Sequence, residues 1–215
     1  MFSRFFRPQR FVRNFSTYRR EVLIDVETTG LNHYKDRIVE ICAREYINNK
    51  PGITWHTYIN PCGKMMSKQA AKCNQISPEI LNNSLTFKNI YNQFLNFVGD
   101  SKIIAHNAQF DIHFLNSELK RIKQFPLQNE KLCTLKLARN LFPNEINNLD
   151  VLCDRFNIDR TTRIKNGHNA HTDTELLHQV YEKLLQEAKT NENYYQILKN
   201  SRYHIPNNKW MLFSL

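Results

Sequence analysis

Apolar and polar residues alternate in three early segments of the chain. Residues 21–27 predict a strand, because side chains point alternately to its two sides. One face would carry Val22, Ile24 and Val26, and the other Leu23, Asp25 and Glu27. Residues 37–47 and 53–59 predict two further strands, with a turn signal over residues 48–52. Together these segments predict an antiparallel meander.

Later segments repeat their apolar residues at helical spacing. This spacing predicts helices over residues 87–98, from about 108 to 122, and over 132–141, 149–156 and 172–188. Residues 103–105 predict a short buried strand, and Ser77-Pro78-Glu79 predicts the start of a helical turn within an otherwise irregular segment, 60–86. Residues 157–168 read as a polar loop. Strands that alternate with helices after a meander predict an α/β fold, a mixed sheet flanked by helices.

The length of 215 residues and the hydrophobic content of 41% suit one domain with a sizeable core. No apolar run is long enough for a transmembrane helix, so we expect no membrane partner. The 5 cysteines are scattered and form no Cys-x-x-Cys pair. This pattern favours reduced thiols over disulfides or a structural zinc site.

Much of the net charge of +10 lies at the N-terminus, since residues 1–20 hold six arginines and no acidic residue. This segment also contains hydroxyl and aromatic residues, a composition typical of a mitochondrial transit peptide. Arg13-Asn14-Phe15-Ser16 resembles a cleavage site for the matrix peptidase. We therefore expect localisation in the mitochondrial matrix. The alternative is a basic arm that binds nucleic acid.

Carboxylates stand at the ends of three predicted elements. Asp25 and Glu27 share one face at the end of the first strand, while Asp111 and Asp173 lie in the first turns of two helices. Each has an ordinary explanation alone, as a solvated strand end or a helix-capping residue. If they converge, their repulsion calls for divalent cations, and oxygen ligands favour Mg²⁺ or Mn²⁺. His168, in the loop before Asp173, could then act as a general base.

Three stretches carry a specific resemblance. Asp25-Val26-Glu27-Thr28-Thr29-Gly30-Leu31, His106-Asn107-Ala108-Gln109-Phe110-Asp111 and the pair His168 and Asp173 resemble the three motifs of the DnaQ-like DEDDh 3′–5′ exonucleases. Connecting segments, among them residues 138–143 and 148–153, are similar to the proofreading epsilon subunits of bacterial DNA polymerase III. The resemblance covers roughly residues 20–189. It implies a ribonuclease H-like exonuclease fold for residues 21–189.

The resemblance also implies a two-metal hydrolysis that releases nucleoside 5′-monophosphates from a 3′ end. Asp25 would bridge both ions, Glu27 and Asp173 would complete the site of the ion that holds the attacking water, and Asp111 would support the second. His168 would take the proton from that water. Thr28, Asn107 and Phe110 would hold the terminal nucleotide and Leu31 would wedge its base. For Phe110 and Leu31 the alternative is simple core packing.

Two departures from the family pattern affect the nucleotide site. The chain has Cys73-Asn74-Gln75-Ile76 where epsilon has Val-His-Gly-Ile, and Gln69 replaces a family Glu. Asn74 and Gln69 can still hydrogen-bond a sugar or phosphate, but the sugar preference stays open. In the C-terminal extension, residues 190–215, the stretch 208–213 resembles a clamp-binding peptide. A tail that docks on a polymerase or another partner is the broader expectation.

Three functions remain in view. The leading one is a 3′–5′ exonuclease on single-stranded or frayed DNA, with a proofreading role. An RNA exonuclease similar to oligoribonuclease is the alternative enzyme, although that family typically has Glu-Met-Thr-Gly where this chain has Glu27-Thr28-Thr29-Gly30. The third is a non-catalytic subunit of a mitochondrial assembly with an exonuclease fold. All five expected catalytic positions are intact, which argues against the third.

Overall fold

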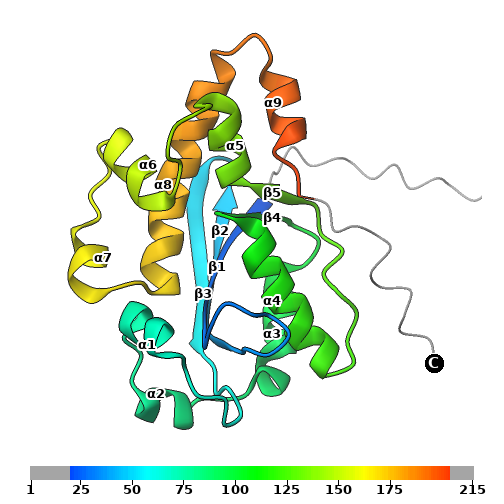
Figure 1. Cartoon of the computed structure of the whole chain (residues 1–215). Helices are drawn as coiled ribbons and strands as arrows, with labels where there is room; N and C mark the ends of the chain where they lie inside the picture. Colours follow the sequence, from blue (N-terminus) through cyan, green and yellow to red (C-terminus); the bar gives the residue numbers. More distant parts are fainter. Residues whose placement is uncertain (1–19, 204–215) are drawn as a thin grey trace, which may run out of the picture.

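The computed structural model describes residues 20–203, which form a five-stranded mixed sheet covered by helices on both faces (Figure 1). The strands are β1 (Arg20–Thr28), β2 (Ile38–Ile47), β3 (Lys50–Tyr58), β4 (Lys102–Ala105) and β5 (Lys131–Cys133). The helices are α1 (Lys68–Asn74), α2 (Pro78–Asn82), α3 (Phe87–Val98), α4 (Ala108–Arg121), α5 (Thr134–Leu141), α6 (Leu149–Arg155), α7 (Thr161–Asn166), α8 (Ala170–Lys189) and α9 (Tyr194–Asn200). The strand order is β3-β2-β1-β4-β5.

The predicted meander is confirmed, since β1 pairs antiparallel with β2, and β2 with β3. The turn between β2 and β3 is shorter than predicted. Asn48 and Asn49 both have positive φ, 50° and 66°, which is the backbone of a two-residue hairpin turn. Strand β3 therefore begins at Lys50 and includes Pro51 and Gly52 at its exposed start.

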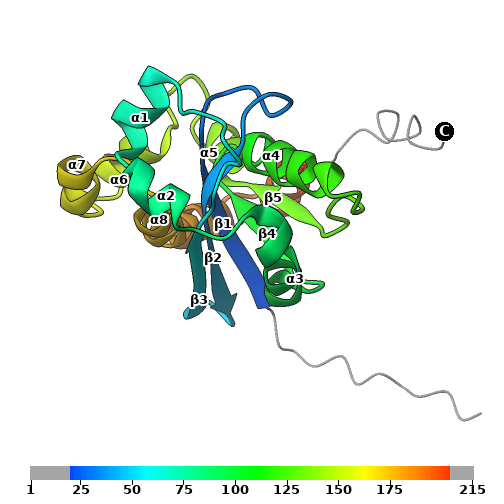
Figure 2. The same cartoon turned by 90° about the horizontal axis from the view of Figure 1, so that it is seen from below.

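Two apolar cores lie on opposite faces of the sheet. Val22, Ile24 and Val26 of β1 pack in one core with residues of α3 and α4. Leu23 packs in the other core with residues of α5, α6, α8 and α9. Seen from below, α3 and α4 lie on one side of the strands and α6 and α8 on the other (Figure 2). The alternation predicted for β1 is thus confirmed, with both faces covered.

The parallel half of the sheet is short, and this opens a site at the end of β1. Strand β4 pairs with β1 only from Glu21 to Leu23, and β5 continues the sheet beyond β4. The remainder of β1 therefore has no strand on that side. Its last residues, with Asp25 and Glu27 among them, face the first turn of α4 and the start of α8.

Four elements were not predicted: α1, α7, α9 and β5. Strand β5 is only three residues long and runs directly into α5. The sequence therefore predicted a single helix over residues 132–141 where the structure has a strand followed by a helix. Helix α9 packs through Ile197 into the second core. Beyond it, the Tyr203 backbone N–H donates to the carbonyl of Lys131 at 2.9 Å. The packed fold therefore extends to Tyr203, past the boundary at residue 189 that the sequence suggested.

The N-terminal segment up to residue 19 and the tail from residue 204, with the clamp-like stretch, lie outside the described residues. Among residues 20–203 no helix is long and apolar enough to cross a membrane. The five cysteines all lie in this part of the chain and form no disulfide.

Candidate active site

Asp25 and Glu27 come from the end of β1, on the face that also carries Leu23. The pairing of β1 with β2 shifts register between Glu27 and Thr28, so the strand ends in an irregularity. The backbone then turns, and Gly30 lies so close to the Asp36 carboxylate that a Cβ atom would stand 2.5 Å from its Oδ2. A larger residue at this position would have to displace the Asp36 side chain, which packs against the turn at the end of β1.

Asp111 occupies the open side of β1. It lies in the first turn of α4, behind Asn107, whose left-handed backbone (φ 61°) begins the helix. Its Oδ1 accepts a hydrogen bond from the backbone N–H of Val26 at 3.2 Å. The Asp111 carboxylate thus binds the edge of β1 where no strand pairs with it, at the backbone of the residue between Asp25 and Glu27.

Asp173 is brought to the site by the N-terminus of α8. Asn169 caps this helix by accepting a hydrogen bond from the Thr172 N–H at 2.8 Å. Glu40, fully buried on β2, accepts the Ala170 N–H at 3.1 Å and pairs with His56 at 2.7 Å. Helix α8 is therefore fixed to the sheet at its first residue, and Asp173 follows one turn later.

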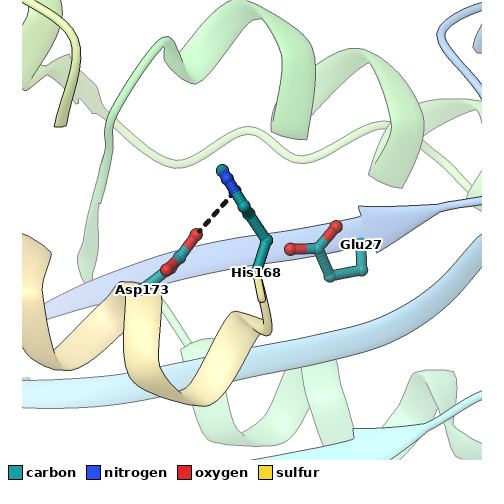
Figure 3. A group of neighbouring side chains, drawn as sticks. All are labelled: Glu27, His168 and Asp173. Atoms are coloured by element: carbon teal, nitrogen blue, oxygen red, sulfur yellow. Dashed lines mark ion pairs between the residues drawn. The ribbon is translucent and has the colours of Figure 1, made fainter. Parts of the chain in front are cut away.

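His168 lies in the short connection between α7 and α8. Its backbone N–H donates to the carbonyl of Cys73, the penultimate residue of α1, at 3.0 Å. Its ring nitrogen Nδ1 lies 3.6 Å from Oδ2 of Asp173 (Figure 3). One ligand atom each of Glu27, His168 and Asp173 lie within 4.8 Å of one another.

All five predicted catalytic residues line one cavity of about 560 Å³. Its other walls come from α4, α5, the segment before α6, and Arg163 of α7. Segments from four distant parts of the sequence thus meet at the end of β1. The alternative of an ordinary solvated strand end does not describe Asp25 and Glu27, which are partly buried among other carboxylates.

The carboxylates have strongly raised pKa values. Removal from bulk water raises the pKa of Asp25 well above its usual range, and the charges of Asp173 and Asp111 raise it further. Desolvation and the charge of Asp173 raise the pKa of Glu27 to about 8. Desolvation raises the pKa values of Asp111 and Asp173 to about 7 each. Clustered carboxylates of this kind are stabilised by a cation.

Comparison with known proteins identifies the family. The sequence model of the exonuclease family (RNase_T) matches residues 22–181. The epsilon subunit of DNA polymerase III from Rickettsia prowazekii is 44% identical over 168 residues, which are 75% of this chain and 72% of that protein. The epsilon subunit from Haemophilus influenzae is 36% identical over 75% of this chain and 66% of its own length. The chain belongs to the DnaQ-like DEDDh exonuclease family.

Solved structures agree on the fold. Exonuclease X in complex with 5′-overhanging duplex DNA superposes with a TM-score of 0.66 at 22% identity, over 84% of this chain and 98% of that one. The nuclease domain of the human DEDDh exonuclease 3′hExo bound to rAMP gives a TM-score of 0.67 at 15% identity, over 80% and 94%. The ribonuclease H-like exonuclease fold expected from the sequence is confirmed. This DEDDh protein is a 3′–5′ exonuclease.

The donor set of this exonuclease suits divalent cations. Oδ1 of Asp173 is buried and makes no hydrogen bond of good geometry among the described residues. The surrounding ligands are carboxylate oxygens, with one imidazole at the edge, and hard oxygen ligands favour Mg²⁺ or Mn²⁺. The residues present therefore fit the metal ions that the DEDDh family generally requires.

The residues predicted to bind the nucleotide divide into three groups. Asn107 and Phe110 line the main cavity. Leu31 is 78% exposed, which excludes core packing, and it lines a neighbouring cavity of about 320 Å³ with the same two residues. Thr28, Gln69 and Asn74 line neither cavity. Asn74 instead donates its side-chain N–H to the carbonyl of Thr28 at 3.1 Å and so supports the end of β1.

Sequence analysis missed Arg163, Glu40 and Arg139 in this exonuclease site. Arg163 is buried at the cavity wall and contacts Asp173. Glu40 was visible as a lone acidic residue inside the apolar run of β2, a signal of a buried polar contact. Arg139 of α5 is exposed at the mouth of the cavity, where its positive charge can face a phosphate. Arg163 gave no signal, because it lies in a segment that read as a polar loop.

Proposed function

We propose that the protein is a metal-dependent exonuclease that removes nucleoside 5′-monophosphates stepwise from the 3′ ends of DNA. The observation that carries the proposal is the convergence of Asp25, Glu27, Asp111, Asp173 and His168 on one cavity. DNA is favoured over RNA because the relatives at 36–44% identity are named as DNA polymerase subunits. The cavity lies at the end of strand β1 of the protein. A single-stranded or frayed DNA end suits it, because one terminal nucleotide could enter without its paired partner.

The four carboxylates would hold two divalent ions, Mg²⁺ or Mn²⁺. When bound, such ions supply an activated water and neutralise the charge that develops on the phosphoryl oxygens. The carboxylates suit this task because their oxygens are fixed by the ends of β1, α4 and α8. Their mutual repulsion is also highest when no cation is present, which favours ion binding.

His168 would accept the proton of the attacking water. Its pKa is lowered, first by desolvation and then by the charge of Arg163, so the ring is neutral at physiological pH and suited to receive a proton. Asn107 and Phe110 would hold the terminal nucleotide in the main cavity. Exposed Leu31, which lines the neighbouring cavity, would separate its base from the preceding one.

A digestion panel tests the substrate. Single-stranded DNA, a duplex with a mismatched 3′ end, a fully paired duplex and RNA of matched sequence would be compared with Mn²⁺ or Mg²⁺. We expect faster release from single-stranded and mismatched DNA than from the paired duplex or RNA. Faster digestion of RNA than of any DNA would overturn the DNA assignment and favour the oligoribonuclease-like function.

A proofreading role with a polymerase is the finer proposal. It is supported by the similarity to proteins that are named as epsilon subunits of DNA polymerase III. We propose that residues 204–215 dock on this partner. Co-purification of the full chain with a polymerase, lost on removal of residues 204–215, would support this role. Retention of the polymerase by the shortened chain would contradict it.

We also propose that residues 1–20 direct the protein to the mitochondrial matrix, on the basis of their arginines and the absence of acidic residues. Fused to a fluorescent protein, this segment should cause import into mitochondria. A variant with its arginines replaced by serine is the control. Cytosolic or nuclear localisation of the unmodified fusion would reject the proposal.

A further inference from the structure

Arg163 contacts both Asp173, a proposed metal ligand, and His168, the proposed base. Its Nη1 lies 2.7 Å from Oδ1 of Asp173, and its Nη2 lies 2.7 Å from Nδ1 of His168. The guanidinium is buried at the wall of the cavity, and it is the cationic group that lines the site beside Asp173. A single side chain thus contacts an expected metal ligand and the expected base at the same time.

The contact with His168 places the guanidinium against its ring. Nη2 of Arg163 lies 2.7 Å from Nδ1 and 3.2 Å from Nε2 of the same imidazole. The lone pairs of the two ring nitrogens point in different directions in the ring plane, so a donor this close to both nitrogens lies over the face of the ring. The guanidinium therefore covers one face of His168.

The contact with Asp173 is one of charge without a well-formed hydrogen bond. Neither Nη1 of Arg163 nor Oδ1 of Asp173 makes a hydrogen bond of good geometry among residues 20–203. A divalent ion at this oxygen would therefore replace the ion pair with Arg163. Nε of Arg163 also lies 3.2 Å from Oδ1 of Asp150, so the side chain keeps a carboxylate partner if it leaves Asp173.

From these contacts we propose that Arg163 is a positioning residue that acts as an internal cation. In the metal-free protein its guanidinium stands in for a divalent ion at Asp173 and covers His168. Metal binding displaces it, and this frees Asp173 as a ligand and His168 as a base together. The inference rests on the proposed metal dependence, and it adds that the ion must compete with a side chain of the protein.

Calorimetric titration of the full chain with Mn²⁺ at constant pH and ionic strength tests the competition. We expect Arg163→Gln to bind Mn²⁺ roughly tenfold more tightly than the wild type, because the binding-competent state no longer has to be released from the guanidinium. Arg163→Lys keeps the charge but loses the planar fork, so its affinity should lie between the two. Tighter Mn²⁺ binding by Arg163→Lys than by Arg163→Gln would show that a positive charge at this position does not compete with the ion, and would overturn the inference.

Arg160→Gln is the matched control. Arg160 immediately precedes α7, pairs with Asp154 at 2.7 Å and carries the same charge, but it contacts neither Asp173 nor His168. Its Mn²⁺ affinity should stay within about twofold of the wild type, as expected for an exposed ion pair. A gain equal to that of Arg163→Gln would reject a specific role for Arg163.

The thermal stability of the same variants gives a second measurement. Without metal, Arg163→Gln should melt below the wild type, since Asp173 loses its counter-charge, and saturating Mn²⁺ should remove that difference. Arg163→Lys serves the titration if the glutamine variant does not fold without metal. Unchanged or weaker Mn²⁺ binding in folded Arg163→Gln would overturn the internal-cation role. Absence of Mn²⁺ binding in the wild type would instead reject the metal-dependent function itself.

Discussion

At the scale of single residues, Asp25 is placed for activity at a cost in stability. Its carboxylate faces Asp111 and Asp173 in a desolvated cavity, and its pKa is raised accordingly. Without metal, these carboxyl groups must either be protonated or repel one another as negative charges. The carboxylate proposed to hold both metal ions is therefore one whose negative charge the metal-free fold opposes.

The Asp25→Asn substitution should separate the effect of this charge on stability from its effect on activity. The amide removes a like charge, so the melting temperature in EDTA at pH 8 should rise by about 2–4 °C, equivalent to about 1 kcal/mol for a chain of this size. Exonuclease activity should fall by about 10³-fold or more, because a central metal ligand is lost. Melting curves and a digestion assay measure both effects, and a lower melting temperature in EDTA would contradict the electrostatic account.

The sequence predicted the motif residues of the site, but it did not predict the residues whose role depends on how distant elements pack. Asp25, Glu27, Asp111, Asp173 and His168 match the motifs of a known family, so the resemblance was enough to group them. Arg163 reaches the cavity only because α7 folds back against α8, and no local pattern records that approach. Asn74 looked like a nucleotide ligand, but its side chain binds the Thr28 carbonyl, which depends on how α1 packs on β1.

At the scale of elements, the connection between α7 and α8 sets the position of His168. Gly167 has a φ of 72°, and a Cβ atom there would stand 2.7 Å from the carbonyl oxygen of Cys73. That carbonyl accepts the His168 N–H, so the histidine segment and α1 are held in close contact. The contact links the base to the segment with the altered nucleotide-site residues.

Gly167→Ala should therefore move His168. We expect the turnover rate on single-stranded DNA to fall by about tenfold, since misplacement of a catalytic group by 1 Å can reduce rates further still. Gly63→Ala is the control, because Gly63 has a similar φ of 80° but nothing within 4 Å of its Cβ position. Both glycines have positive φ, so equal losses of turnover would show that backbone strain at a positive-φ glycine, and not the position of His168, is responsible.

The start of α8 depends on Glu40. This buried carboxylate accepts the Ala170 N–H and pairs with His56, so Glu40→Ala leaves a buried donor without a partner. Such a loss costs about 1–3 kcal/mol, or a fall in melting temperature of about 5 °C. Glu175→Ala, which removes an exposed carboxylate of the same helix, should change it by less than about 2 °C. Equal effects of the two substitutions would reject the role of Glu40.

At the scale of the whole molecule, long periodic segments were predictable and short ones were not. Helices α3 and α8 and the meander follow clear periods and were predicted to within a few residues. Strand β5, with three residues, and helices α1 and α7, with seven and six, bury too few residues to leave a period. Tertiary contacts select these short elements, and one of them, α7, supplies Arg163 to the wall of the cavity.

The carboxylate cluster should also shape the pH dependence of overall stability. The pKa values of Glu27, Asp111 and Asp173 lie at about 7–8 in the folded state, above their unfolded values of about 4. At these groups the folded protein binds more protons than the unfolded chain, so their contribution to the free energy of unfolding should fall as pH rises from 6.5 to 8.

Thermal melts in EDTA at these two pH values measure the effect. Histidines with lowered pKa values, among them His106 and His168, act in the opposite direction, because they take up protons on unfolding near pH 6.5. Asp25→Asn keeps these histidines, so its difference from the wild type reports on the carboxylates. Between pH 6.5 and 8 the melting temperature of the wild type should fall more, or rise less, than that of Asp25→Asn, and Mn²⁺ should stabilise the wild type more at pH 8 than at pH 6.5. An equal pH dependence in the two proteins would show that the carboxylates are not held as described.

The central claim, that this carboxylate cluster performs metal-dependent cleavage at 3′ ends, is tested most directly by digestion of single-stranded DNA labelled at its 5′ end. With Mn²⁺ or Mg²⁺, the wild-type protein should shorten the labelled strand stepwise and release nucleoside 5′-monophosphates. EDTA and the Asp25→Ala substitution should each stop the release. Cleavage that persists in EDTA or in Asp25→Ala, or that begins at the 5′ end, would contradict the account.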